Sequence, residues 1–153
     1  MAEKKPAKEE RLGDLLVRKK AITKEQLDKA VQCQVLFGGR LGTNLLELGF
    51  VRESQLREIL EEKYGLPSIR RDELADIPAE VYKLVTPELA ERHKLVPVRV
   101  EGESLETAML DPWRESAIQA LTEITSQKIT PMIASELDIM WALEKYYGVR
   151  RDA

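Results

Sequence analysis

A 24-residue pattern occurs twice near the start of the chain, and it limits the fold more than any other feature of the sequence. Residues 11–34 and 40–63 align at an offset of 29 positions without a gap, and five residues separate the two copies. The aligned pairs that are identical are Arg11/Arg40, Leu12/Leu41, Gly13/Gly42, Leu16/Leu45, Gln26/Gln55 and Leu27/Leu56. Self-similarity of this kind indicates a duplicated supersecondary unit.

Leucine and other apolar residues within each copy recur at helical spacing, in two groups separated by a short polar stretch. Each copy therefore predicts a pair of helices. Thr23 followed by Gln26 is a capping-box pattern that starts the second helix of copy one. Copy two lacks this cap because Arg52 replaces Thr23, whereas Gly49 and Gly65 are suited to end its helices.

The pattern changes after Gly65. Pro78 and Pro87 are each expected to open a short helix at its first position, with Thr86 as the cap of the second. Two alternating segments, residues 95–100 and 105–110, flank a polar turn and predict a hairpin, in which Pro97 favours an edge strand.

The remaining elements are a helix started by Asp111, Pro112 and Trp113, a strand at residues 128–134, and a last helix capped by Ser135 that ends at Gly148. The predicted fold class is α+β. A duplicated helix-pair subdomain at residues 11–65 is followed by a small ββαβα subdomain at residues 66–148. Residues 1–10 are expected to form a disordered N-terminal tail, and residues 149–153 a second tail.

Composition excludes several classes of protein. With one cysteine and one histidine, Cys33 and His93, the chain offers no internal disulfide, no zinc site and no catalytic dyad, so we expect no metal and no catalytic residues. No apolar stretch approaches a membrane span, and residues 1–10 lack a signal-peptide core, which predicts a soluble, cytoplasmic protein without direct membrane insertion. The net charge of -3 argues against binding to a nucleic acid polymer.

Charge is unevenly distributed: residues 1–50 carry ten Lys and Arg against seven acids, although the whole chain is acidic. Two copies of Arg-Leu-Gly suggest two equivalent half-sites for a small anionic ligand. An arginine fork can hold a phosphate or the O6/N7 edge of guanine, and Gln34 can both donate to and accept from a purine. The glycines indicate either close helix packing or close approach of a ligand.

The doubled motif RLGxxLxxxxxLxxxxLxxxLxxQ with its five-residue spacer resembles MshEN-type cyclic di-GMP receptor domains, found at the N-termini of type II secretion and type IV pilus assembly ATPases (GspE/PilB-like). Residues 87–97, 108–113, 133–136 and 146–148 resemble the α/β remainder of the same domains. The resemblance covers about residues 11–148. No GxxxxGK[ST] loop occurs, so the motor domain of such ATPases is not encoded in this sequence.

The resemblance implies a set of ligand-binding positions in each copy. In copy one they are Arg11, Leu12, Gly13, Leu16, Ile22, Leu27, Val31 and Gln34. In copy two they are Arg40, Leu41, Gly42, Leu45, Val51, Leu56, Leu60 and Lys63. Two positions depart from the pattern: Lys63 replaces the terminal glutamine, and Lys20 stands where many relatives have glycine, as at Gly49. Lysine donates hydrogen bonds but cannot accept them.

The leading hypothesis is a non-enzymatic receptor or adaptor without cofactors, with cyclic di-GMP as the ligand and a pilus or secretion component as the protein partner. The alternative is a nucleotide-independent docking module for the same apparatus with a degenerate ligand site. A third interpretation treats residues 22–34 as a DNA-recognition helix, against which the acidic charge and the repeat both argue.

Overall fold

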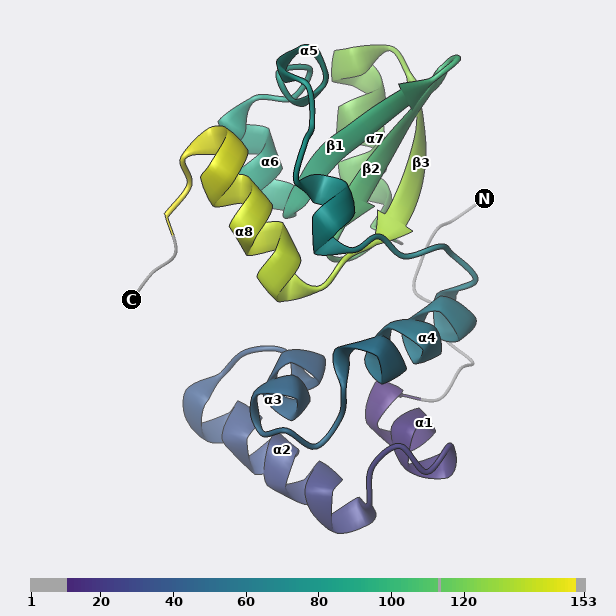
Figure 1. The fold of residues 1–153 in the computed structure, drawn as a ribbon, viewed down its shortest axis with the longest axis vertical. Coiled ribbons are helices and arrows are strands. Elements are labelled where there is room, and N and C mark those ends of the chain that lie inside the picture. Colours follow the sequence, from purple (N-terminus) through teal and green to yellow (C-terminus); the bar gives the residue numbers. More distant parts are fainter. Residues whose placement is uncertain (1–10, 113, 151–153) are drawn as a thin grey trace. The chain divides into compact units, whose positions relative to one another are not determined.

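The structure, a computed structural model, describes residues 11–112 and 114–150 (Figure 1). The expected N-terminal tail, Trp113 and residues 151–153 lie outside the described residues. The described chain divides after Gly65 into two compact units, which we call the helical unit (residues 11–65) and the α/β unit (residues 66–150). The fold is α+β, with the duplicated helices first and a small sheet with its own helices after them.

Each copy of the repeat forms one helix pair, as predicted. The helices are α1 (Leu12–Arg18), α2 (Lys24–Phe37), α3 (Leu41–Glu47) and α4 (Glu53–Tyr64). Thr23 and Gln26 form the expected capping box, with Oγ1 of Thr23 accepting from the Gln26 amide at 3.0 Å and Oε1 of Gln26 accepting from the Thr23 amide at 2.9 Å. In copy two only the second bond remains: Oε1 of Gln55 accepts from the Arg52 amide at 3.0 Å, because a guanidinium has no acceptor atom.

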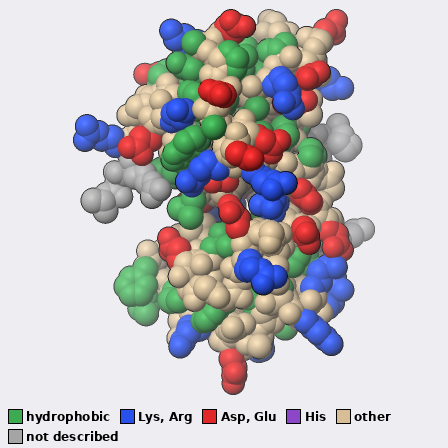
Figure 2. Space-filling model, viewed as in Figure 1, with side chains coloured by type: hydrophobic (Ala, Val, Ile, Leu, Met, Phe, Trp, Pro, Cys, Tyr) green, Lys and Arg blue, Asp and Glu red, His purple; other side chains and the backbone are tan. Residues whose placement is uncertain are grey.

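Helix α2 continues three residues past the end of the repeat, and Gly38 ends it at φ 80°. These three residues are the most exposed large apolar side chains of the described chain: Val35 at 79%, Leu36 at 73% and Phe37 at 82%. Figure 2 shows hydrophobic atoms projecting at its lower left, over this end of α2. The helical pattern therefore extends beyond the repeat without a core to cover it.

The two copies pack against each other through one leucine of each copy, which lies next to the motif glycine of the other copy. A Cβ on Gly13 would lie 3.2 Å from Cδ2 of Leu41, and a Cβ on Gly42 would lie 3.8 Å from Cδ2 of Leu12. The first turns of α1 and α3 are thus in contact around a local pseudo-twofold relation. Residues of both copies form a single core in the helical unit: Leu15, Leu16, Ile22, Leu27, Ala30, Leu45, Val51, Leu56 and Ile59.

The α/β unit contains a three-stranded sheet in the order β1-β2-β3, in which β1 (Leu95–Glu101) pairs antiparallel and β3 (Lys128–Ile133) parallel with β2 (Ser104–Met109). Pro97 lies on edge strand β1, as predicted. The helical elements are η1 (Arg71–Leu74), α5 (Ala79–Tyr82), α6 (Pro87–His93), α7 (Glu115–Thr125) and α8 (Glu136–Tyr147). Their buried side chains and those of the sheet make the second core. The predicted ββαβα order is present.

Three predicted details of this unit were wrong. Pro78 is the cap of α5 and not its first residue, since its ψ of 147° keeps it extended. Helix α7 begins at Glu115, because Asp111 first forms a turn in which its carbonyl accepts from the Arg114 amide and its carboxylate binds the Arg114 guanidinium at 2.8 Å. Val149, assigned to the tail, packs on the core, and its amide donates to Leu143.

Tyrosines at the end of α8 fix the segment that precedes the sheet. The Tyr146 hydroxyl donates to the carbonyl of Leu74 and accepts from the Ile77 amide at 3.0 Å. The Tyr147 hydroxyl donates to the carbonyl of Tyr82. Burial raises the pKa of both tyrosines. These three bonds connect η1 and α5 to α8 across about 70 residues of chain.

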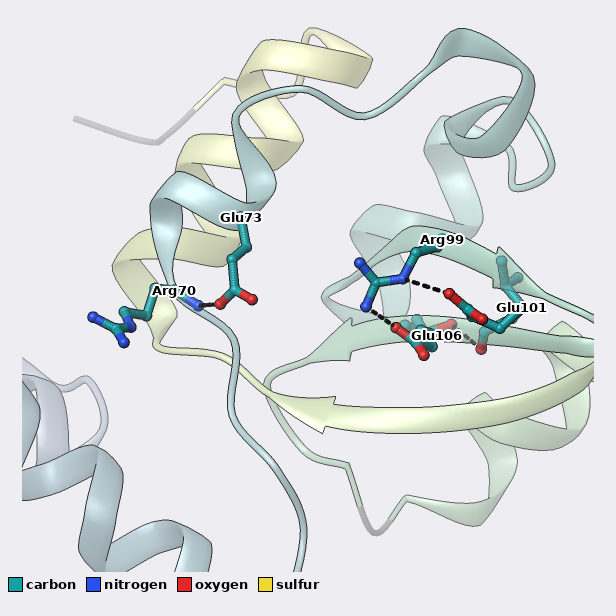
Figure 3. A network of polar contacts seen from close by, with 7 residues as sticks. Arg70, Glu73, Arg99, Glu101 and Glu106 are labelled. Atoms are coloured by element: carbon teal, nitrogen blue, oxygen red, sulfur yellow. Dashed lines mark hydrogen bonds and ion pairs between the residues drawn. The ribbon is translucent and has the colours of Figure 1, made fainter.

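The exposed end of the hairpin carries a separate polar network (Figure 3). Arg99 on β1 lies between Glu106, which faces it on β2, and Glu101 near the turn, with Nε of Arg99 3.4 Å from Oε2 of Glu101. Such exposed pairs stabilise little, so the network adds little to the stability of the hairpin. Among the described residues, no helix is long and apolar enough to cross a membrane.

Candidate functional site

The two motif arginines occupy equivalent positions. Arg11 is the cap residue of α1 and Arg40 the cap residue of α3, each with an extended backbone and without a side-chain hydrogen bond that caps its helix. Both side chains are exposed. Because the first turns of α1 and α3 pack on each other, the two arginines precede neighbouring helix starts.

The motif glycines are explained by packing. A Cβ on Gly13 would lie 2.7 Å from Cδ1 of Leu27, and a Cβ on Gly42 would lie 3.2 Å from Cδ2 of Leu56. In each copy the first helix thus approaches the second through the glycine. Of the two sequence-based explanations, the structure accounts for the glycines by helix contact, and the space next to Gly13 is filled by leucine side chains.

Most apolar residues of the predicted ligand set belong to the core. The six that are 7% exposed or less are Leu16, Ile22, Leu27, Leu45, Val51 and Leu56. Leu12, Leu41 and Leu60 are half-buried and pack against that core. Val31 differs from its counterpart Leu60, because 40% of Val31 is exposed. The leucines available beside the arginines are therefore Leu12 and Leu41.

The last residue of the motif differs in environment as well as in chemistry between the copies. Nε2 of Gln34 donates to the carbonyl of Gly39 at 3.1 Å, so one of its amide hydrogens is used within the chain. Lys63 is only 9% exposed, and its Nζ lies 5.4 Å from the centre of the Tyr64 ring. The two half-sites are not equivalent at this position.

A shallow pocket of about 470 Å³ lies between the turn that follows α1 and the face of α4. Its lining is mixed in charge and consists of Lys19, Lys20, Ala21, Gln55, Glu58, Ile59 and Glu62. Nζ of Lys19 binds Oε1 of Glu62 at 2.9 Å, which connects the two copies. Sequence reasoning did not find this pocket. The one available signal was Lys20, which takes φ 63° where copy two has Gly49 at φ 78°.

The single histidine and cysteine lie outside any reactive cluster. Burial, followed by the positive charges of Arg92 and Arg114, lowers the pKa of His93 from its usual 6.5. Cys33 is a half-buried free thiol on α2. Within the described parts of the chain, no group of three or more His, Cys, Asp or Glu side chains is arranged to hold a metal ion.

Comparison with solved structures supports the same fold. The structure of MshE with cdg, that is cyclic di-GMP, matches with a TM-score of 0.69 and 31% identity, covering 91% of this chain and 100% of that chain. The N-terminal domain of XpsE matches with a TM-score of 0.64 at 24% identity, covering 92% of this chain and 99% of that one, which shows a common fold.

Among curated proteins, the type IV pilus assembly ATPase PilB of Myxococcus xanthus (strain DK1622) is 42% identical over 138 residues. The match covers 90% of this chain but only 24% of PilB, and the chain spans about a quarter or less of the length of its curated relatives. The family model for the MshEN domain matches residues 64–153. The chain, whose curated relatives include the type IV pilus assembly ATPase PilB and a type II secretion system protein E, therefore belongs to the MshEN domain family.

Proposed function

We propose that the chain is a non-enzymatic receptor for cyclic di-GMP that acts in the cytoplasm, and that a component of a pilus or secretion machine is its protein partner. In this proposal the duplicated helix pairs each hold one half of the ligand. Arg11 and Arg40 bind its phosphates or guanine edges, and Leu12 and Leu41 provide apolar contacts beside them.

The observation that carries the proposal is the pseudo-twofold contact between α1 and α3. Leu12 lies near Gly42 and Leu41 near Gly13, so the two helix starts that carry the exposed arginines are neighbours. A ligand made of two identical nucleotide halves needs a pair of equivalent cationic groups at close range. Guanidinium groups suit it because they form bidentate charge-assisted hydrogen bonds to phosphate and to the O6/N7 edge of guanine.

The buried leucines of the motif hold in place the helices that carry the site. Leu16 and Leu45 are fully buried, and they hold α1 and α3 against the second helices of the two copies. A rigid platform lowers the entropy that the arginines lose on binding. Gln34 retains one amide hydrogen and its carbonyl oxygen for a purine, whereas Lys63 can only donate. The two halves of the ligand are thus held unequally at this position.

Isothermal titration of the purified chain with cyclic di-GMP, with GTP as the competing nucleotide, tests the proposal. Arg11→Ala and Arg40→Ala should each weaken binding by about tenfold or more, because hydrogen bonds to charged groups contribute about 1.5–3 kcal/mol. Arg52→Ala is the matched control, since Arg52 is also an exposed cap residue, at α4, but lies outside the ligand set. If Arg11→Ala and Arg40→Ala bind cyclic di-GMP as tightly as Arg52→Ala and the wild type do, the site assignment is wrong.

A nucleotide-independent docking module is the second candidate, favoured by the replacement of glutamine by Lys63 and by the exposed apolar end of α2. A flat titration with protein that is folded by circular dichroism would support it. Binding of a pilus or secretion ATPase that is unaffected both by the nucleotide and by Arg11→Ala would then be expected.

A further inference from the structure

Side-chain amides from the helices on either side bind the two glycines at the end of the five-residue spacer between the copies. Gly38 and Gly39 have φ values of 80° and 90°, in the region that glycine occupies freely. Such a pair leaves the connection between α2 and α3 with much conformational freedom unless other groups restrain it. Figure 1 shows this connection as the loop that joins the two helices.

Two amides provide the restraint. Nε2 of Gln34, on α2, donates to the carbonyl of Gly39 at 3.1 Å, and Nδ2 of Asn44, on α3, donates to the carbonyl of Gly38 at 3.2 Å. The bonds cross: Gln34, before the spacer, binds the second glycine, and Asn44, in the helix that follows the spacer, binds the first. Asn44 also packs on the spacer, with Oδ1 3.7 Å from the point a Cβ on Gly39 would take.

Asn44 departs from the repeat at this position. Its counterpart in copy one is Leu15, which is 6% exposed and belongs to the core of the helical unit. Asparagine is a poorer helix former than leucine and buries less apolar surface. A polar residue in place of a core leucine therefore needs a local reason, and the bond to Gly38 supplies one.

Arg40 follows Gly39 directly and is the cap residue of α3, so the conformation of the spacer determines where its side chain begins. We propose that Asn44, together with Gln34, is a positioning residue that clasps the spacer and so fixes Arg40 at the start of α3. The effect on ligand binding rests on the proposed function. The effect on the spacer does not.

Limited proteolysis of the full chain tests the clasp without a ligand. Leu36 and Phe37 are exposed chymotrypsin sites within the segment that the clasp restrains. Cleavage there requires local opening, and its rate follows the population of the open form when reclosing is fast. Asn44→Ala and Gln34→Ala should each raise the rate about fivefold, the factor expected for the loss of one neutral hydrogen bond.

An isosteric variant separates hydrogen bonding from helix stability. Asn44→Asp keeps the shape of the side chain and puts a negative charge near the start of α3, which favours the helix. Its carboxylate cannot donate to Gly38, so cleavage should rise as in Asn44→Ala. Protection of Asn44→Asp equal to the wild type would overturn the clasp. Glu47→Ala on α3 and Gln32→Ala on α2 are the controls, since both residues are exposed and outside the spacer.

Titration with cyclic di-GMP then measures the consequence for Arg40. Asn44→Ala should weaken binding less than Arg40→Ala does, by about threefold to fivefold, because the arginine is retained but less ordered. Faster cleavage with unchanged affinity would contradict the positioning role. If the wild type binds no cyclic di-GMP, the proposed function fails, and the cleavage rates alone decide whether the clasp exists.

Discussion

Cδ1 of Leu27 lies 2.7 Å from the point where a Cβ on Gly13 would stand, whereas the nearest atom to the equivalent point on Gly42 is Cδ2 of Leu56 at 3.2 Å. The two copies therefore tolerate a methyl group unequally, although their glycines are aligned in the repeat. Burial agrees with the distances, since Gly13 is buried and Gly42 half-buried.

Gly13→Ala should destabilise the protein by about 1 kcal/mol net, because the overpacking cost of about 1–3 kcal/mol exceeds the gain in helix propensity of up to about 1 kcal/mol. Gly42→Ala should lie within about 0.5 kcal/mol of the wild type, since its contacts are looser and the same gain offsets them. Urea denaturation followed by circular dichroism measures both. A larger loss for Gly42→Ala than for Gly13→Ala would contradict the packing explanation.

Lys20→Gly should stabilise the protein by about 0.5–1 kcal/mol. Lys20 has φ 63°, where a side chain costs about 1–2 kcal/mol, and glycine removes this cost. The greater conformational freedom of glycine in the unfolded chain offsets only part of the stabilisation. Lys20→Ala is the control, since it removes the charge and keeps the strained backbone. If both variants melt at the same temperature, the charge and not the backbone determines the effect.

Arg71→Ala should destabilise the α/β unit by about 1–2 kcal/mol, less than the loss expected for a fully buried pair because Arg71 is half-exposed. Nε of Arg71 lies 2.9 Å from Oδ1 of Asp138, whose side chain is only 6% exposed. The guanidinium also lies 5.3 Å from the centre of the Trp141 ring, so the fluorescence of that tryptophan should change. Arg70→Ala is the matched control. The side chain of Arg70 is exposed, so its removal should leave both the stability and the tryptophan fluorescence unchanged.

Stability should fall as the pH rises above 10, the ordinary pKa of tyrosine. Burial raises the pKa of Tyr147, so the folded protein holds this proton at a pH where the unfolded chain has lost it. The contribution of protonated Tyr147 to the free energy of unfolding is therefore complete below pH 10 and declines above it. Tyr147→Phe should be less stable at neutral pH, because it loses the bond to Tyr82, but should show a shallower alkaline decline. Parallel pH profiles for the two proteins would contradict this assignment.

The sequence predicted the helix pairs, the hairpin and the ββαβα order of elements along the chain, because repeat spacing and turn residues are local signals. It also predicted that Arg52 cannot replace the Thr23 cap, since this follows from the chemistry of a guanidinium. It could not decide between packing and ligand approach for Gly13, because this depends on where Leu27 and Leu41 lie in space. The role of Asn44 was missed for the same reason: its partner, Gly38, is defined only once the spacer has folded.

The start of α7 shows the limit of proline signals. Pro112 suggested that the helix begins near Asp111, but the contacts between Asp111 and Arg114 form a turn first. The spacing of a proline from a helix is a weak constraint, and a carboxylate that binds a nearby arginine can displace the helix start.

Copy one leaves the ribosome first, but Leu12 has its partner only when Gly42 has followed, and Gly13 receives the contact of Leu41 at the same moment. The first helix pair therefore remains incomplete while the spacer emerges, with the apolar end of α2 already exposed. We therefore expect the helical unit to complete its core only when both copies are present, and a nascent chain that is stalled between the copies to be a substrate for chaperones.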